Sequence, residues 1–147
     1  MFKKNKKNLP NRKKDPFLEL HKKVSFNEDY KRAKRTIITP SLFKDKKNKN
    51  ELSKMISNNI FREDEYYNLS FCKVKAVKTV FAFCDLRGCD FSEATLSKCD
   101  FSFADLRDCN FSNAVIRECS FRHARFKNTI FSGADDFLCD FQGVILN

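Results

Sequence analysis

The sequence predicts a repeat solenoid behind a basic leader, and two observations support this fold class. From Phe71 to the end the chain repeats itself every ten residues, as the decads that begin at Cys89 and Cys99 illustrate. Each decad is two pentapeptides in which a small residue, Cys or Ala, stands two places before a large apolar one. So short a period is typical of a solenoid, whose units stack into one continuous core. Charge is the second observation, because residues 1–65 hold 19 Lys and Arg against 9 Asp and Glu, whereas residues 66–147 hold 10 of each.

The large apolar positions define a core ladder with five-residue spacing. Ala76 is a weak member, and Asp136 is the one failure, because a charge at an inward position is not buried without a partner. We expect a local bulge at Asp136 that brings Phe137 inward before Cys139 restores the register. The predicted ladder consists of Phe71, Phe81, Leu86, Phe91, Leu96, Phe101, Leu106, Phe111, Ile116, Phe121, Phe126, Phe131, Phe141 and Leu146.

Residues 69–147 resemble the pentapeptide-repeat family, whose units read roughly Ala-(Asp/Asn)-Leu-X-X. The resemblance implies an all-β solenoid, a right-handed quadrilateral β-helix with four pentapeptides to a coil. Read with the twenty-residue period of four sides, the ladder separates into two opposed Phe columns and two mainly aliphatic ones. We expect about four coils over residues 67–147, spaced by about 4.8 Å as in any parallel sheet.

Two segments precede the solenoid. Residues 1–49 form a basic, low-complexity leader that buries too little apolar surface to fold alone, so we expect it to be mostly disordered. In residues 50–66 the apolar side chains of Leu52, Met55, Ile56 and Ile60 keep the one-sided spacing of an amphipathic helix. A solenoid has open ends, and we therefore predict that this short helix is an N-terminal cap, followed by a linker.

The leader is the candidate segment for binding anionic surfaces. The positive charge of the leader predicts weak, salt-dependent contact with nucleic acid or an anionic membrane. Alternatively it is a targeting signal or a solubilising tail. No apolar run has the length of a transmembrane segment or follows the pattern of a secretory signal, so we expect a cytoplasmic chain. The basic residues concerned are Lys3, Lys4, Lys6, Lys7, Arg12, Lys13, Lys14, Lys31, Arg32, Lys34 and Arg35.

Six of the seven cysteines occupy the small inward position, and Cys72 alone falls outside it. A free Cys in a core behaves as a small hydrophobic residue, so packing explains the six. Their ten-residue spacing differs from the close clustering of zinc ligands. We predict free thiols in a reducing compartment, with no metal and no cofactor. The six are Cys84, Cys89, Cys99, Cys109, Cys119 and Cys139.

A candidate partner surface lies outside the ladder. With the twenty-residue period Phe83, Phe103 and His123 stack on three successive coils, and aromatic side chains rimmed by charge are typical of binding surfaces. Alternatively, the rings fold over a coil corner and shield the backbone. The charged neighbours are a basic column of Arg87, Arg107 and Lys127, with Asp85 and Asp105 between it and the rings.

Catalysis is not expected, because the chain has two histidines and three glycines, and no glycine lies in a phosphate-binding loop. We therefore predict a non-enzymatic protein-binding module. The segment from Phe101 to Phe111 is similar to the quinolone-resistance proteins of the family, bacterial proteins that resemble duplex DNA and engage DNA gyrase and other type II topoisomerases.

That resemblance implies, as a first alternative, a topoisomerase modulator. The solenoid of this chain is neutral, however, and lacks the C-terminal helix and the inserted loops of those proteins. A second alternative is a secreted or tethered bacterial effector that uses the leader for targeting. A homodimer through the uncapped C-terminal coil is a further expectation.

Overall fold

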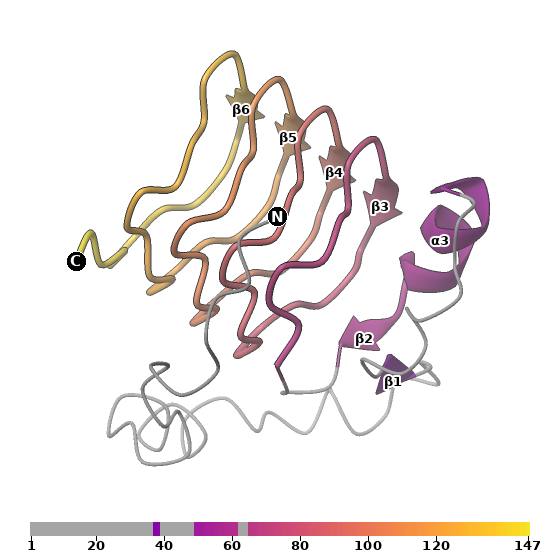
Figure 1. The fold of residues 1–147 in the computed structure, drawn as a ribbon, viewed down its shortest axis with the longest axis horizontal. Helices are drawn as coiled ribbons and strands as arrows, with labels where there is room; N and C mark the ends of the chain where they lie inside the picture. Colours follow the sequence, from indigo (N-terminus) through magenta and orange to yellow (C-terminus); the bar gives the residue numbers. More distant parts are fainter. Residues whose placement is uncertain (1–36, 39–48, 62–64) are drawn as a thin grey trace. The chain divides into compact units, whose positions relative to one another are not determined.

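The computed structural model describes residues 37–38, 49–61 and 65–147. The predicted anionic-surface residues at positions 3–35 lie outside these ranges. Figure 1 shows successive coils stacked side by side, each adding one short strand to the same wall. The elements are β1 (Ile37–Ile38), α3 (Lys49–Ile56), β2 (Ile60–Phe61), β3 (Lys75–Val77), β4 (Thr95–Ser97), β5 (Val115–Arg117) and β6 (Asp135–Phe137).

The coil repeats every twenty residues, as the sequence predicts. Strands β3 to β6 form a parallel sheet in which Ala76 lies beside Leu96 and Leu96 beside Ile116. The other walls carry isolated parallel bridges with the same spacing, for example between Asp85 and Asp105. The predicted right-handed quadrilateral β-helix is therefore confirmed.

Tight turns produce the corners between walls. The amide of Cys84 donates to the carbonyl of Phe81 at 3.1 Å, and the same bond recurs between Ala104 and Phe101. The residue before the donor has a positive φ, 63° at Phe83 and 59° at Phe103. This geometry is that of a type II turn, which usually places glycine at that position. Side chains at these corners therefore accept a left-handed backbone and must be supported by their neighbours.

Phenylalanine rings fill the centre of the solenoid. Rings of one column are parallel and close, with centroids 4.7 Å apart for Phe71–Phe91 and for Phe81–Phe101. Rings of opposite columns meet edge to face, for example Phe81 and Phe91 at 5.9 Å and 88°. Both arrangements are the favoured ones for aromatic pairs. The ladder residues from Phe71 to Phe121 are all fully buried.

The last coil differs from the predicted ladder. Asp136 lies in strand register beside Ile116, so the expected bulge is absent and that prediction was wrong. Phe137 stays outward and is 55% exposed, and Leu146, counted as a ladder residue, is 75% exposed. The cause is that within the described residues no coil covers this one. The Asp136 carboxylate is exposed there, and no bulge is needed to remove it from the core.

Helix α3 contacts the first coil. The Oγ of Ser53 accepts a hydrogen bond from the Lys75 amide at 2.9 Å, and the Oγ of Ser57 accepts one from the Val77 amide at 3.2 Å. Ile56 belongs to the buried core cluster. The strand pair β1–β2 is parallel, and β2 is bridged to the first coil at Val80. The boundaries of leader, cap and solenoid stay a prediction.

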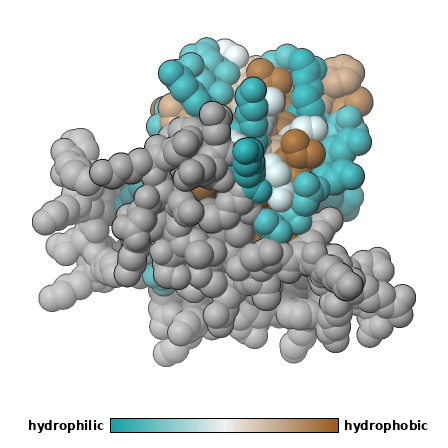
Figure 2. Space-filling view, turned by 90° about the vertical axis from the view of Figure 1, so that its right-hand side faces the viewer, coloured by the Kyte–Doolittle hydropathy of each residue, from teal (hydrophilic) through white to brown (hydrophobic). Residues whose placement is uncertain are grey.

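The visible face in Figure 2 mixes hydrophilic and hydrophobic side chains over the described residues. Helices of the described ranges are all too short or too polar to cross a membrane.

Candidate protein-binding wall

Three rings form a stack at one corner of the solenoid, and we call Phe83, Phe103 and His123 the aromatic column. The ring centroids of Phe83 and Phe103 are 5.0 Å apart with an interplanar angle of 14°. Those of Phe103 and His123 are 4.9 Å apart at 8°. The column stands outside the buried core cluster, because its residues occupy the positive-φ turn position and not the ladder.

The column is less exposed than the sequence analysis expects. Phe83 is only 6% exposed, and Phe103 and His123 are half-buried. Stacking accounts for part of this, since each face of the Phe103 ring is covered by a neighbouring ring. Phe83 therefore lies outside the core cluster but is not exposed, contrary to the expectation of an exposed ring.

The next coil continues the column with a glycine. A Cβ added at Gly143 would lie 2.3 Å from Nδ1 of His123, so the imidazole occupies the space above this residue. Gly143 also has a φ of 71°, which favours glycine. His123 is thus held between the Phe103 ring and the backbone of the last coil.

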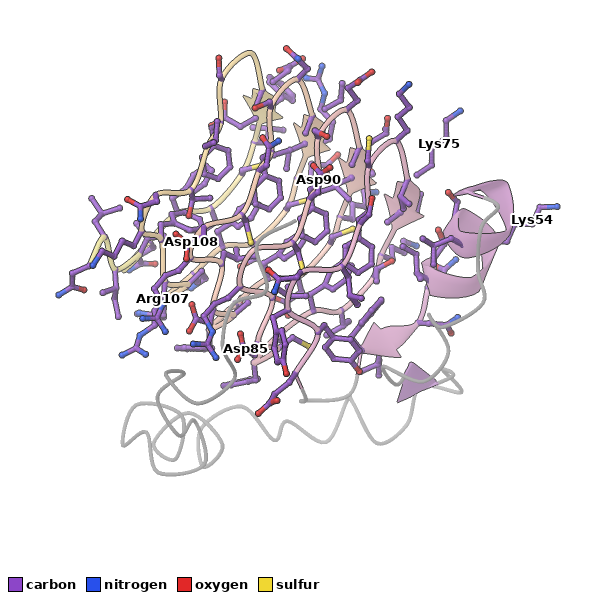
Figure 3. All side chains as sticks on the ribbon, viewed as in Figure 1. Lys54, Lys75, Asp85, Asp90, Arg107 and Asp108 are labelled. Atoms are coloured by element: carbon purple, nitrogen blue, oxygen red, sulfur yellow. The ribbon has the colours of Figure 1, made fainter. Side chains whose placement is uncertain are left out.

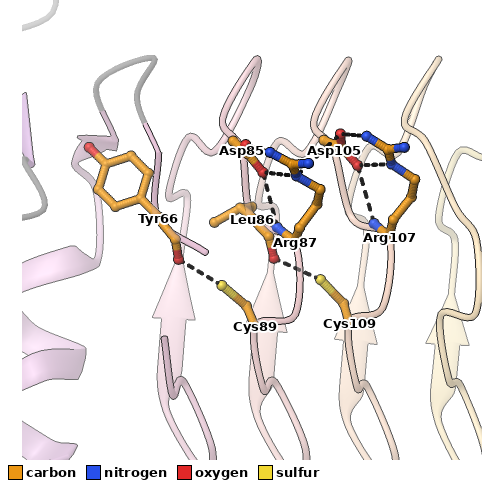
Figure 4. Close-up of polar contacts among 8 residues, drawn as sticks. All are labelled: Tyr66, Asp85, Leu86, Arg87, Cys89, Asp105, Arg107 and Cys109. Atoms are coloured by element: carbon orange, nitrogen blue, oxygen red, sulfur yellow. Dashed lines mark hydrogen bonds and ion pairs between the residues drawn. The ribbon is translucent and has the colours of Figure 1, made fainter. Parts of the chain in front are cut away.

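The adjoining wall carries two charged pairs, which we call the Asp–Arg ladder: Asp85 with Arg87, and Asp105 with Arg107. The Nε of Arg87 donates to Asp85 at 2.8 Å and its Nη2 at 2.5 Å. Arg107 repeats the arrangement on Asp105, at 2.8 and 2.6 Å. Arg87 also lies 3.8 Å from Asp105, which joins the two pairs (Figure 4).

Local sequence explains this ladder. Residues one place before and one place after a ladder position both point outward from the same wall, so Asp85 and Arg87 flank Leu86 and meet each other. Bidentate pairing is the strong form of the Arg–carboxylate interaction. Hydrogen bonding to Asp85 raises the pKa of Arg87, and hydrogen bonding to Asp105 raises that of Arg107.

The pairing changes the predicted basic column. Two of its three members are neutralised by aspartates, and Lys127 is exposed without an ion pair to any described residue. In Figure 3 Asp85, Arg107 and Asp108 lie along one side of the coils, away from Lys54 and Lys75. The structure thus pairs the aspartates with the arginines, whereas the Lys127 side chain is in none of the ion pairs between described residues.

Arg107 keeps donors for a partner. Its pair with Asp105 uses Nε and Nη2, so both Nη1 protons have no acceptor among the described residues. Its side chain is 22% exposed, against 9% for Arg87. Arg107 is therefore a fixed cation at the surface, four residues along the chain from the half-buried Phe103.

The cysteines do more than fill space. The Sγ of Cys89 donates to the carbonyl of Tyr66 at 3.0 Å, and that of Cys109 to Leu86 at 3.0 Å. Thr129 occupies the equivalent position one coil later, and its hydroxyl donates to Leu106 at 2.8 Å. The packing argument from the repeat does not include this role, although a threonine in a column of cysteines indicates a hydrogen-bond donor.

The described cysteines are all free. Burial raises the pKa of Cys89 and of Cys109 well above the ordinary thiol range. Cys72 and Cys139 are only half-buried. Across the described part of the chain no three His, Cys, Asp or Glu side chains gather as a metal site.

The family model described as pentapeptide repeats matches residues 77–113 and 104–135, with eight copies. A search of curated proteins found no similar sequence.

Among solved structures, the chain is similar to a pentapeptide repeat protein, Rfr23, from the cyanobacterium Cyanothece 51142. The identity is 15% and the TM-score 0.43, over 62% of this chain and 59% of that one. A pentapeptide repeat protein from the Arabidopsis thaliana thylakoid lumen is 28% identical with a TM-score of 0.39, over 63% of this chain and 68% of that one. QnrB1, a plasmid-mediated fluoroquinolone resistance protein, is 16% identical with a TM-score of 0.39, over 73% of this chain and 47% of that one. This chain therefore spans about three fifths of Rfr23 and about half of QnrB1.

A four-sided parallel coil built from pentapeptides with a small and a large inward residue defines a class of repeat solenoids. Residues 77–135 are therefore pentapeptide repeats of this family.

Proposed function

We propose that this chain is a non-enzymatic module that binds another protein at the corner formed by the aromatic column and the Asp–Arg ladder. Members of the family are in general non-enzymatic repeat proteins, which supports the first part of the proposal. The second part rests on one observation, that the guanidinium of Arg107 is fixed by Asp105, which lies in the sequence between Arg107 and the half-buried Phe103.

Pre-organisation is the reason that this observation favours binding. An arginine that is free in solution loses side-chain entropy when a partner fixes it. Arg107 is already fixed by two hydrogen bonds to Asp105, so much of that cost is met before a partner arrives. Arginine and aromatic residues are also enriched among the side chains that dominate interface energies.

The expected partner presents a hydrogen-bond acceptor beside an apolar group. The two Nη1 protons of Arg107 suit a carboxylate or a main-chain carbonyl. The accessible parts of Phe103 and His123 suit an apolar or aromatic side chain placed next to that acceptor. Asp105 is occupied by its arginine, so a cationic partner has less to gain there.

Affinity capture with the full chain tests the proposal. Proteins retained from a bacterial lysate are identified for the wild type, for Arg107→Ala and for Arg122→Ala, a matched change in an exposed pair on the next coil. We expect one or more specific partners to be lost with Arg107→Ala and kept with Arg122→Ala. Equal retention by the three proteins would contradict the proposal.

Phe103→Ser is a second variant for this capture. It removes the middle ring of the column and should also weaken capture, with a thermal melt as control. The Phe83 ring is unsuitable for this test, because it is buried and its removal is expected to affect stability.

The alternative of a type II topoisomerase modulator stays a prediction. A DNA-like surface needs unpaired acidic side chains, whereas Asp85 and Asp105 are neutralised by arginines. A gyrase supercoiling assay with the full chain, with and without a quinolone, tests this alternative directly. The effector alternative depends on the leader and stays a prediction as well.

A further inference from the structure

The outer edge of the last coil is a surface separate from the wall described above. Strand β6 pairs with β5 on one side, and no described strand lies on the other. Such an edge offers a row of main-chain donors and acceptors to another strand. Phe137 and Leu138 are 55% and 69% exposed, and Phe131 and Phe141 are only partly buried. The edge therefore combines main-chain groups with apolar surface.

The Asp136 carboxylate determines which charge a partner side chain needs at this edge. Asp136 stands in the register of the buried column, beside Ile116, and its carboxylate makes no hydrogen bond or ion pair with a described residue. The other two carboxylates of the coil are held by the coil before it. Arg117 binds Asp135 at 2.5 Å, and Arg122 binds Asp140 at 3.4 Å.

Any strand that covers this coil must therefore meet the Asp136 carboxylate. Covering it with apolar groups alone would bury an unpaired charge at considerable cost. A lysine or arginine placed opposite Asp136 removes that cost and adds a charge-assisted hydrogen bond.

The net charges of the coils support a basic neighbour. Counted from residue 69 in units of twenty, the first and third coils each hold four basic and one acidic residue. The second holds two basic and five acidic residues, and the fourth holds three aspartates and no Lys or Arg. Acidic and basic coils alternate, so the complement of the fourth coil is a basic segment.

We propose that this edge binds an extended segment of a partner protein by strand addition, with a Lys or Arg facing Asp136 and apolar side chains over Phe131 and Phe141. Main-chain hydrogen bonds supply affinity in this mode, and side chains supply specificity. A second copy of the chain is a poorer occupant. Its last coil would add three carboxylates and no cation.

Fluorescence anisotropy with the full chain tests the proposal. The probe is a short fluorescein-labelled peptide of alternating valine and threonine, with one central lysine on the valine face. Two control peptides carry norleucine or glutamate in place of the lysine. We expect the lysine peptide to bind at least about tenfold more tightly than the norleucine peptide, as for a charge-assisted hydrogen bond, and the glutamate peptide not to bind.

Charge exchange supplies the matched variants. Asp136→Asn should reduce the preference for the lysine peptide to near unity, and Asp136→Lys should transfer it to the glutamate peptide. Glu93→Gln, an exposed change on the second coil, should alter neither. Far-UV circular dichroism and a thermal melt check that each variant is folded.

Three results would overturn the proposal. They are equal binding of the lysine and norleucine peptides, no binding of any peptide, and a preference for lysine that survives Asp136→Lys. Analytical ultracentrifugation of the wild type and of Asp136→Asn tests whether a second copy of the chain occupies this edge. A stable dimer that Asp136→Asn strengthens would show instead that a second copy covers this edge despite its charge, which would also overturn the proposal.

Discussion

At the scale of single residues, the small inward position of the repeat serves two different needs. Before the aliphatic columns it is filled mainly by Ala, as at Ala94, Ala104 and Ala114, with Cys84 as an exception. Before the Phe columns it is filled mainly by Cys or Thr, whose side chains donate to a carbonyl of the preceding coil. A buried carbonyl without a donor is costly, so a donor at this corner stabilises the stack.

Cys109 allows this role to be measured with an isosteric pair. Cys109→Thr keeps a donor for the Leu86 carbonyl, as Thr129 does for Leu106, whereas Cys109→Val has the same shape and no donor. We expect the Val variant to be less stable than the Thr variant by about 1 kcal/mol, the usual net contribution of a hydrogen bond. Urea unfolding of both variants gives the difference. Equal stabilities would mean that the small position selects only for size.

Thiol reactivity should follow burial. Because burial raises the pKa of Cys89 and Cys109, we expect both to resist alkylation in the folded chain, and the half-buried Cys72 to react first. Peptide mass spectrometry after brief iodoacetamide treatment checks the order. Modification of Cys109 as fast as of Cys72 would contradict it.

The same raised pKa values predict how stability depends on pH. The unfolded chain loses thiol protons near the ordinary pKa of 9.0, while the folded chain keeps them. The free energy of unfolding should therefore fall as the pH rises above about 9. Urea unfolding at several alkaline pH values checks this, and Cys109→Thr should make the fall shallower.

At the scale of elements, helix α3 meets a strand edge through side chains. Ser53 lies on the helix and Ser57 directly follows its last residue, and they accept hydrogen bonds from the amides of Lys75 and Val77. Strand β3 pairs with β4 on its other side. The helix therefore supplies acceptors to amides on the side of β3 away from β4, which supports the proposed role of α3 as a cap.

Hydrogen exchange tests this role. With Ser53 and Ser57 both changed to Ala, the amides of Lys75 and Val77 should exchange faster, while the Thr95 amide, bonded to Val74, should not change. We expect a loss of about 1 kcal/mol for each hydrogen bond. Unaltered exchange at Lys75 and Val77 would show that the helix does not close the edge.

At the scale of the whole molecule, the excess positive charge belongs to residues 1–65 and the solenoid is neutral. We predict that the full chain binds duplex DNA and anionic vesicles at low salt, and that a chain lacking residues 1–36 binds both much more weakly. That truncation keeps β1 and α3. Counterion release should make DNA binding fall steeply with salt. Filter binding over a salt series checks the prediction, which a salt-insensitive complex would contradict.

Much of the fold follows from the sequence because a solenoid is built from local repeats. The five-residue spacing already identifies the inward residues, and the twenty-residue period places Phe91 beside Phe111 and Phe83 beside Phe103. The resemblance to the pentapeptide family supplied the four walls. Inward Cys, Ala and Phe could be assigned without coordinates, because each coil repeats the environment of the one before it.

Tertiary structure alone decided features that depend on what lies next to a side chain. Periodicity located Asp85 and Arg87 on one wall, but only the structure showed their bidentate pair and the remaining donors of Arg107. It also showed that Phe83 is buried and that Asp136 stays in register without a bulge. The physical reason is that a repeat fixes the direction of each side chain, whereas burial and pairing depend on neighbouring coils and on whether another coil follows.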